Sequence, residues 1–303
     1  MRYTSQDEDA FFDNLGTKGR HYMELQNFTA MLREARERHY TVAALNTLNM
    51  ETVQAVTAAA AEAASPVIVQ IYHKDLAFAG AGYIAAIAAE AAREACYPIC
   101  LSLDHGQSFD QAMDCMAHHF TGVMIDLSTS DFERNIADTK RVVAEARARG
   151  VSVEAELGKI FSAKETACVR NSAMTDPEAA AVFAEKTGVD ALAVSIGTAH
   201  GLYASAPVID FERLEKIIRI CPCPIVVHGG SDVPDEQIKE MVRLGVAKLN
   251  IGTDLMMAFK RSLAESLAAG PGVSTSLLLS EARRKVQEMA AHKFELLNAY
   301  RVG

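Results

Sequence analysis

Three histidines, each followed by glycine, lie far apart in the 303-residue chain. His105 and His200 occur in the dipeptide HG, and His228 occurs in HGG. Three neutral imidazoles that leave a fourth position open form a catalytic site for a divalent metal, most naturally zinc. The other histidines lack this pattern, and we interpret them as ordinary core or surface residues: His21, His39, His73, His118, His119 and His292.

Asp104 directly precedes His105 in the stretch LSLDHG. Two ionisable groups at the end of an apolar run are costly to bury unless they have a use. Neighbouring residues of a strand point to opposite faces, so both can face one site only where the strand ends, which Gly106 permits. Asp104 would then serve as an acid or base beside the metal. The structural alternative is a capping or salt-bridging role.

Further carboxylates follow two later apolar runs. Asp126 closes GVMIDLS, while Glu154 and Glu156 lie two residues apart in VSVEAELG and share one face of a strand. Two buried carboxylates require a cation or a basic partner. They are expected either to bind a cation or to form a buried ionic network with Lys248 or an arginine.

Two glycine-rich segments predict an anion site. HGGSDVPDEQ precedes a helix expected near Pro234, and NIGTDL precedes the last helix of the repeating pattern. Backbone N–H groups of such loops, together with helix N-termini, bind phosphate well. The residues concerned are Gly229, Gly230, Ser231, Asn250, Ile251, Gly252 and Thr253.

Short β-branched runs alternate with longer amphipathic runs from residue 27 to 300. Most of the short runs are continuously apolar, which is typical of parallel strands covered on both faces. The predicted strands are 40–46, 65–72, 98–105, 122–128, 151–158, 191–197, 224–230 and 247–254. The predicted helices are 27–39, 50–64, 80–95, 109–119, 131–150, 175–188, 210–221, 234–245, 255–270 and 276–300.

Eight strand–helix units within about 250 residues predict an α/β fold, the (β/α)8 TIM barrel. The first helix would precede the barrel, and the last would be an addition after the eighth unit. A doubly wound open sheet is the alternative, but such sheets usually have fewer strands. In a barrel the carboxyl ends of the strands meet at one mouth, so the three histidines would converge there.

The chain divides into an N-terminal extension, residues 1–26, and a single barrel domain, residues 27–303, because no Pro- or Ser-rich linker separates further parts. A net charge of -9 argues against nucleic acid as a partner. The chain offers no apolar stretch of the roughly 20 residues that span a membrane, and its first residues lack the apolar core of a signal peptide. The six cysteines lack zinc-site spacing. We therefore expect a cytoplasmic protein without a membrane partner.

With these residues placed, the chain resembles the class II, metal-dependent ketose-bisphosphate aldolases, most closely the tagatose- and fructose-bisphosphate branch. The resemblance runs from about residue 27 to 300. It is carried by YTVAALNTLNMETVQAV, LSLDHG, VMIDLS, VEAELG, TDPEAA, GVDALAVSIGTAHGLY, VVHGGSDVPDE and KLNIGTD.

The resemblance implies an aldehyde-lyase that reversibly cleaves a ketose (bis)phosphate, such as tagatose- or fructose-1,6-bisphosphate. The products would be dihydroxyacetone phosphate and an aldehyde, formed through a metal-stabilised enediolate. It implies Zn2+, or another divalent ion, on His105, His200 and His228, with Asp104 as proton donor or acceptor. Asp126 and Glu156 match carboxylates that hold a second metal or a monovalent cation in some members. Gly201, Gly229 to Ser231 and Asn250 to Thr253 match groups that bind dihydroxyacetone phosphate. Family members are usually dimers or tetramers, so a homodimer or homotetramer is expected.

The chain departs from the family pattern at two places. After VEAELG it continues KIFSAKETACVR, without the glycine pair of a mobile loop that supplies a second acid–base group. Lys164 stands near the expected acidic position, and Glu165, one residue displaced, is the candidate for that role. The segment before the last helix lacks the basic residues that hold a far phosphate, because Arg283 and Arg284 come later.

Two alternatives compete with the aldolase interpretation. A metal-dependent barrel hydrolase usually takes an HxH pair from its first strand, where this chain has Asn46, so we disfavour it and keep Asn46 as a minor site candidate. A zinc- and phosphate-binding barrel that has lost catalysis could have a binding or regulatory role. The altered segment 159–170 favours that alternative, whereas the complete set of Asp104 and three histidines argues against it.

Overall fold

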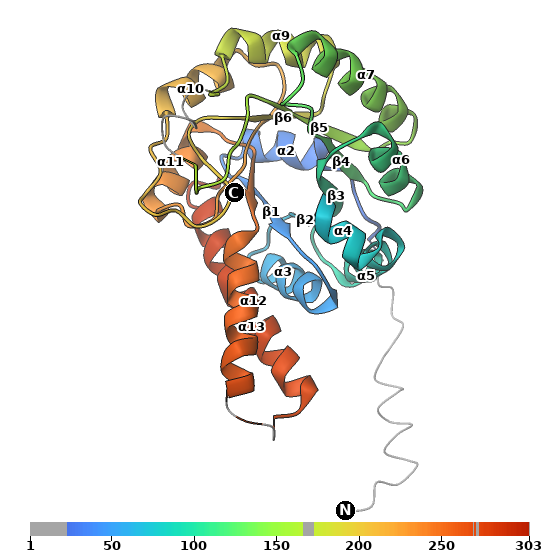
Figure 1. The fold of residues 1–303 in the computed structure, drawn as a ribbon, viewed down its shortest axis with the longest axis vertical. Coiled ribbons are helices and arrows are strands. Elements are labelled where there is room, and N and C mark those ends of the chain that lie inside the picture. The colour runs from blue at the N-terminus through green and yellow to red at the C-terminus, as the bar shows by residue number, and fades with distance from the viewer. Residues whose placement is uncertain (1–22, 166–172, 269, 271–272, 303) are drawn as a thin grey trace, which may run out of the picture.

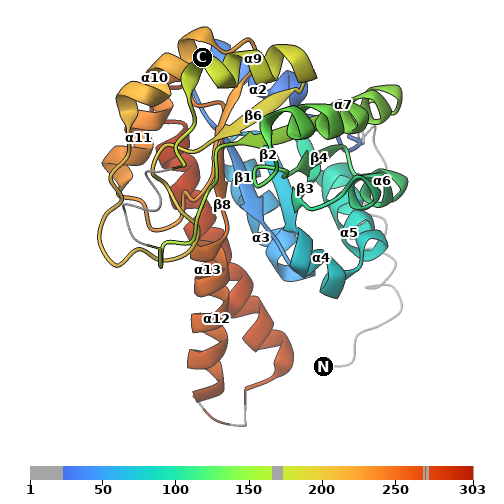
Figure 2. The ribbon, with the colours of Figure 1, turned by 45° about the horizontal axis from the view of Figure 1, so that its top comes forward.

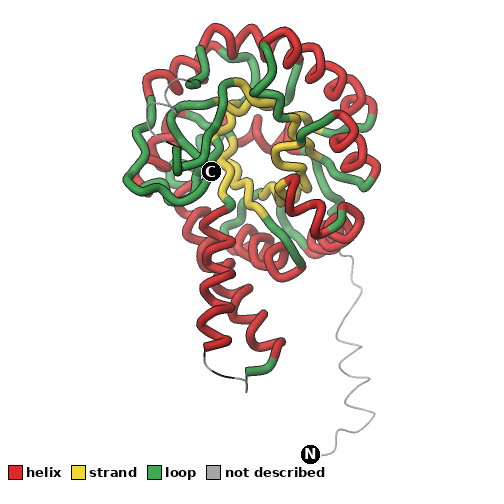
Figure 3. Tube along the Cα trace, viewed as in Figure 1, coloured by secondary structure: helices red, strands yellow, loops and turns green. Residues whose placement is uncertain are grey.

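Eight parallel strands close into a barrel in the computed structural model, which describes residues 23–165, 173–268, 270 and 273–302. Each strand pairs with its neighbour in the sequence, and β8 pairs with β1 to close the ring (Figure 3). The strands are β1 (Val42–Asn46), β2 (Val67–Tyr72), β3 (Ile99–Gly106), β4 (Gly122–Ile125), β5 (Ser152–Leu157), β6 (Ala191–Val194), β7 (Ile225–Val227) and β8 (Lys248–Ile251).

Helices surround this ring on the outside (Figure 1). They are α3 (Met50–Glu62), α4 (His73–Ala79), α5 (Ala81–Glu94), α6 (Phe109–Ala117), α7 (Phe132–Ala148), α9 (Pro177–Thr187), α10 (Phe211–Ile220), α11 (Asp235–Leu244), α12 (Thr253–Ala268) and α13 (Thr275–Leu297). A further helix, α2 (Phe28–Glu37), precedes the first strand. The predicted (β/α)8 barrel with an N-terminal helix and an extra C-terminal helix is confirmed.

The apolar side chains form two separate cores because successive residues of each strand point to opposite faces. In β2, Ile68 belongs to the cluster inside the barrel, whereas Val67, Val69 and Ile71 belong to the cluster between strands and helices. Burying one such aliphatic side chain stabilises the fold by about 1.5–3 kcal/mol. The outer cluster therefore holds the helices on the ring.

Helix α2 closes the amino end of the barrel. Its buried residues Phe28, Met31 and Leu32 join the inner cluster. The side chain of Asn27 caps the helix by accepting from the Thr29 N–H at 3.2 Å. Since this end is plugged, access to the barrel interior is from the carboxyl ends of the strands.

Helices α12 and α13 form a hairpin that extends beyond the barrel (Figure 2). Lys293 of α13 joins the base of this hairpin by an ion pair of 2.8 Å with Asp254 of α12. No single helix in the described ranges is long and apolar enough to cross a membrane. The pair α4 and α5 passes that test by length and composition alone, and the two helices are bent by 92°.

Two details of the sequence-based prediction are wrong. Several strands end earlier than predicted, for example β4 at Ile125 and β7 at Val227, because the following Asp, His and Gly residues leave the ladder. The sequence also indicated no helix between residues 73 and 79, where α4 follows β2 directly. Both differences lie at the carboxyl end of the barrel, where they shape the mouth.

Candidate active site

A break in β3 lets Asp104 and His105 face the same space. His105 has a left-handed backbone conformation, with φ 51°, and the register between β3 and β4 shifts between Leu103 and Gly106. Such a conformation is uncommon for a residue other than glycine and costs about 1–2 kcal/mol. Glycine is required at 106, since a Cβ there would lie 2.4 Å from the Met124 carbonyl oxygen. Both side chains line one cavity at the mouth. The sequence analysis expected this arrangement only if the strand ends at these residues.

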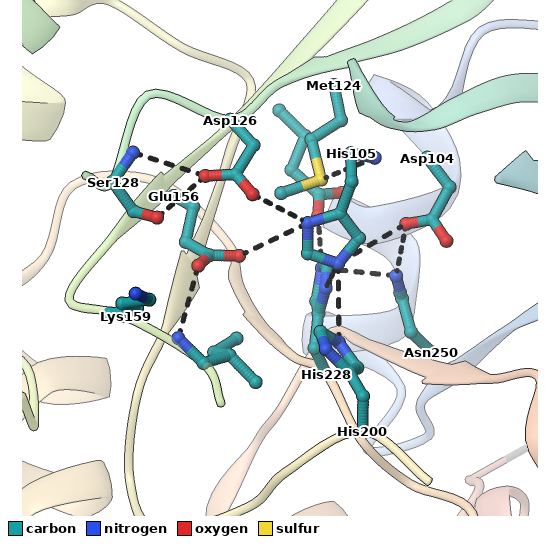
Figure 4. A network of polar contacts seen from close by, with 12 residues as sticks. Asp104, His105, Met124, Asp126, Ser128, Glu156, Lys159, His200, His228 and Asn250 are labelled. Carbon is teal, nitrogen blue, oxygen red and sulfur yellow. Dashed lines mark hydrogen bonds and ion pairs between the residues drawn. The ribbon is translucent and has the colours of Figure 1, made fainter. Parts of the chain in front are cut away.

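The three histidines converge at this mouth (Figure 4). His105 Nε2 lies 3.3 Å from His200 Nε2 and 2.9 Å from His228 Nδ1. His200 follows β6 and His228 follows β7, so three strand exits contribute one ligand atom each. The three side chains offer ligand atoms that all lie within 4.8 Å of one another.

Carboxylates orient two of these imidazoles. His105 Nδ1 donates to Asp126 Oδ2 at 2.8 Å, and His228 Nε2 donates to Glu154 Oε1 at 2.8 Å. These bonds leave His105 Nε2 and His228 Nδ1 directed at the common centre, 2.9 Å apart. Carboxylates in this role are typical of metal-binding histidines.

The electrostatics of the site favour a cation. Burial lowers the pKa of His200 to about 4 and also lowers that of His228, so both are neutral at pH 7. Burial opposes charge on His105 as well, but Asp104 and Asp126 outweigh it and raise its pKa to about 9. The carboxylates thus favour positive charge where three nitrogens meet. This donor set fits a divalent metal.

A second group of donors lies beside the first. His105, Asp126 and Glu156 also offer ligand atoms within 4.8 Å of one another. Glu156 is buried. Its burial, and to a lesser extent repulsion from Asp126, raises its pKa to about 8. Its Oε2 has no hydrogen-bond partner among the described residues. A buried carboxylate oxygen of this kind fits a cation, in line with the second site inferred for Asp126 and Glu156.

Glu154 belongs to a buried ionic network with Lys248, which is the alternative to cation binding in the sequence analysis. Lys248 Nζ lies 2.7 Å from Glu154 Oε2 and 2.7 Å from Asn250 Oδ1, and all three side chains are buried inside the barrel. Asn250 also donates to Asp104 Oδ1 at 3.2 Å. The network therefore connects the base of the site to both His228 and Asp104.

The cavity at the mouth has a volume of about 660 Å³. Many residues inferred from the sequence line it: Asn46, Asp104, His105, Asp126, His200, Gly201, Gly229, Ser231, Asn250, Gly252 and Thr253. His228, Glu156 and Gly230 are buried and are not among the lining residues, and the Ile251 side chain packs in the outer core. Glu165 is exposed and also lies outside the lining.

Other lining residues had no role in the sequence analysis: Tyr72, His73, Lys74, Asp75, Gln107, Ile160, Met256, Met257 and Lys260. Tyr72 ends the second predicted strand, 65–72, and residues 73–75 directly follow it, so their position at a strand exit was a usable signal. Met256, Met257 and Lys260 lie three, four and seven residues after Thr253, on one face of α12. His73 is thus not an ordinary surface histidine, because it lies in the cavity wall.

Gly229 allows the loops that carry His200 and His228 to pack closely against each other. Its φ is 72°, and a Cβ at this position would lie 2.4 Å from the Ala199 carbonyl oxygen. Gly229→Ala is expected to lower the free energy of unfolding by about 3 kcal/mol and to weaken divalent-metal binding about tenfold or more. Denaturant unfolding and zinc titration measure the two effects.

Gly150→Ala is the matched control for this change. Gly150 has a similar φ of 70°, but a Cβ there would meet nothing within 4 Å. It should cost only about 1 kcal/mol and leave zinc affinity unchanged. Equal effects of the two substitutions on zinc affinity would contradict the role given to Gly229.

Comparisons with known proteins agree with this geometry. Residues 26–301 match the protein family described as fructose-bisphosphate aldolase class-II. A fructose-bisphosphate aldolase of Thermus caldophilus is 39% identical over 295 residues, which cover 89% of this chain and 96% of the relative.

Solved structures of aldolases are also similar to this chain. The YdjI aldolase from Escherichia coli K12 is 33% identical, with a TM-score of 0.81 over 90% of this chain and 97% of that one. Fructose-bisphosphate aldolase (Fba) from Campylobacter jejuni, 23% identical, shares the fold with a TM-score of 0.78 over 92% of this chain and 97% of that one. The chain therefore belongs to the class II fructose-bisphosphate aldolase family, whose members are metal-dependent aldehyde-lyases.

Proposed function

We propose that the protein is a zinc-dependent aldolase that reversibly cleaves a ketose 1-phosphate or 1,6-bisphosphate. Tagatose 1,6-bisphosphate and fructose 1,6-bisphosphate are the model substrates, and the products are dihydroxyacetone phosphate and an aldehyde. One observation carries the proposal: three imidazole nitrogens and the carboxylate of Asp104 lie together at the carboxyl end of the barrel. Three imidazole nitrogens that leave one position open are the donor set of catalytic zinc sites, and His105 would give up its proton when the cation binds.

His105, His200 and His228 would hold the cation. When bound, it would polarise the substrate carbonyl and stabilise negative charge on the oxygen. Asp126 and Glu154 keep two of the imidazoles in the required orientation, through the hydrogen bonds of 2.8 Å described above. The protein thereby holds its ligands in place before any substrate enters.

Asp104 lies beside the three metal-binding histidines, outside their group of donor atoms, where it can move a proton. Its Oδ1 lies 3.9 Å from His105 Nε2, and Asn46 Nδ2 donates to its Oδ2 at 2.8 Å. Burial disfavours ionisation of Asp104, but His105, His228 and Asn46 outweigh burial and lower its pKa. The ionised carboxylate can therefore accept a proton at neutral pH.

In the cleavage direction, Asp104 takes the proton of the hydroxyl group beside the bond that breaks. That oxygen becomes the carbonyl oxygen of the aldehyde, and the electron pair of the carbon–carbon bond stays with the dihydroxyacetone phosphate half. The carbon that keeps this electron pair takes up one proton to complete dihydroxyacetone phosphate, and we assign no residue as its donor. In the synthetic direction, Asp104 returns the proton to the new hydroxyl. We assign no step to Glu165, since its side chain is exposed and outside the cavity lining.

The phosphate of the dihydroxyacetone half is proposed to bind between the glycine-rich loops. Gly201, Gly229, Gly252 and Thr253 line the cavity there, and Thr253 is the first residue of α12. Ser231 connects these loops, because its Oγ accepts from the N–H groups of Gly252 at 3.2 Å and Asp254 at 3.1 Å. The helix N-terminus and the loop backbone favour an anion at this point.

A coupled assay for dihydroxyacetone phosphate release tests the proposal. Zinc-loaded protein is given a panel of ketose 1-phosphates and 1,6-bisphosphates, with and without a chelator. Release from at least one sugar, lost on chelation, is expected. Silence of the zinc-loaded protein across the whole panel would contradict the proposed function.

A further inference from the structure

The three proposed metal ligands are oriented in different ways. Asp126 accepts from His105 Nδ1 at 2.8 Å. Glu154 accepts from His228 Nε2 at the same distance. The imidazole of His200 meets that of His105 at 3.3 Å between their Nε2 atoms, and no carboxylate among the described residues forms a hydrogen bond or ion pair with it. The orientation of His200 therefore depends on how its backbone is held.

Hydrogen bonds hold the backbone of His200 and that of the residue before it. The His200 N–H donates to the Phe161 carbonyl oxygen at 2.9 Å, and the His200 carbonyl oxygen accepts from the Ala163 N–H at 2.8 Å. The polar groups of Ala199 both meet one side chain, the hydroxyl of Tyr203. The Ala199 N–H donates to this hydroxyl at 2.6 Å, and the hydroxyl donates to the Ala199 carbonyl oxygen at 2.9 Å.

The same hydroxyl reaches the loop that carries His228. Tyr203 Oη lies 3.2 Å from the carbonyl oxygen of Gly229, so its one hydrogen can be donated to Gly229 in place of Ala199. The Tyr203 N–H donates to Asp232 Oδ2, in the same loop, at 2.8 Å. Tyr203 thus connects the loop after β6 to the loop after β7, at the point where their backbones touch.

Tyr203 acts from outside the cavity. It is not among the lining residues, and its ring packs half-buried against the outer core. Strand β6 ends at Val194, so Ala199 lies beyond the ladder and its polar groups have no strand partner. A phenol hydroxyl can accept from an N–H and donate to a carbonyl at once. It therefore satisfies both groups of Ala199 and fixes the residue that directly precedes His200.

We propose that Tyr203 is a positioning residue, which fixes His200 for the metal through the backbone of Ala199. It gives the third ligand the fixed orientation that carboxylates give to His105 and His228. This inference rests on the metal site of the proposed function. It assigns Tyr203 no contact with the sugar and no part in proton transfer.

Metal binding by Tyr203→Phe tests the proposal without any sugar present. The substitution removes one oxygen atom and leaves the ring in place. Zinc affinity of the full chain, measured by competition with a chelating dye, is expected to fall by about 10–100-fold. With Co2+ in place of zinc, the visible absorption band reports how the ligands are arranged around the ion. This band should shift or lose intensity in the variant.

Two control variants separate this role from general stability. Thr41→Val removes a buried hydroxyl that donates to the Val246 carbonyl oxygen at 2.6 Å, just before β1 at the amino end of the barrel. It should lower the urea midpoint about as much as Tyr203→Phe and leave zinc affinity within about twofold. Tyr40→Phe removes a buried phenol hydroxyl that has no hydrogen-bond partner among the described residues, and it should change neither property.

A double-mutant cycle tests whether Tyr203 acts through His200. In a His200→Ala background, Tyr203→Phe should change zinc affinity by less than about twofold, because the ligand that it positions is gone. A full effect of Tyr203→Phe in that background would overturn the proposal.

The positioning role is refuted if Tyr203→Phe keeps the zinc affinity and the cobalt band of the wild type, or if Thr41→Val weakens zinc binding as much. A loss of zinc affinity in Tyr203→Phe, with no cleavage of any ketose phosphate by the wild type, would support the positioning role and reject the aldolase proposal. Cleavage by the wild type, with unchanged metal binding in Tyr203→Phe, would do the reverse.

Discussion

Asp104→Ala is expected to lower kcat/KM for ketose phosphate cleavage by about 10²–10⁴-fold and to leave the metal bound. The carboxylate lies beside the three ligands, but the group of donor atoms formed by His105, His200 and His228 does not include it, so it is not needed for coordination. Asn46 and Asn250 hold both of its oxygens by hydrogen bonds, which indicates a fixed position for proton transfer. Steady-state kinetics and zinc content per chain are the two measurements.

Asp104→Asn is the matched control for shape. It preserves the size of the side chain and removes its basicity, so it should lose about as much activity as the alanine variant. The account of Asp104 is wrong if either variant retains wild-type turnover, or if activity disappears only in proportion to lost zinc.

Lys248→Met is expected to lower the free energy of unfolding by about 3–5 kcal/mol, because it leaves Glu154 charged in the barrel interior without a cationic partner, beside only the neutral His228. The Lys248 side chain is only 2% exposed and that of Glu154 1% exposed. Urea unfolding of the metal-free protein measures the loss. Lys239→Met removes a lysine whose partner, Glu236, lies on the surface at 2.8 Å, and should cause no measurable change.

The double variant Lys248→Met/Glu154→Leu separates stability from metal binding. Replacing both members of the pair by apolar side chains should restore most of the lost stability. It also removes the acceptor that orients His228, so zinc affinity should fall by about 10–100-fold. Recovery of stability together with unchanged zinc affinity would contradict the orienting role of Glu154.

The barrel was predictable because its signal is repeated. Eight apolar runs alternate with amphipathic ones, and each repeat supports the same interpretation. Convergence of His105, His200 and His228 followed from that fold, since the carboxyl ends of parallel strands in a barrel meet at one mouth. The distances between their nitrogens are consistent with this expectation.

The finer features depend on contacts between distant residues. The sequence could not decide whether Glu154 binds a cation or pairs with Lys248, because the register of the two intervening strands, β6 and β7, determines which side chains meet inside the barrel. The left-handed conformation of His105 depends on Met124 and Gly106, which pack around it. Helix α4 was not predicted because it has only 7 residues and no side-chain cap.

Removal and return of the metal tests whether the three histidines hold the ion on which cleavage depends. Protein freed of metal by a chelator should release no dihydroxyacetone phosphate from its sugar substrate. Activity should return in proportion to added zinc and reach its maximum at one tightly bound ion per chain, whereas His228→Ala should recover neither binding nor activity. Full activity of the metal-free protein, or zinc binding that does not depend on His228, would contradict the account.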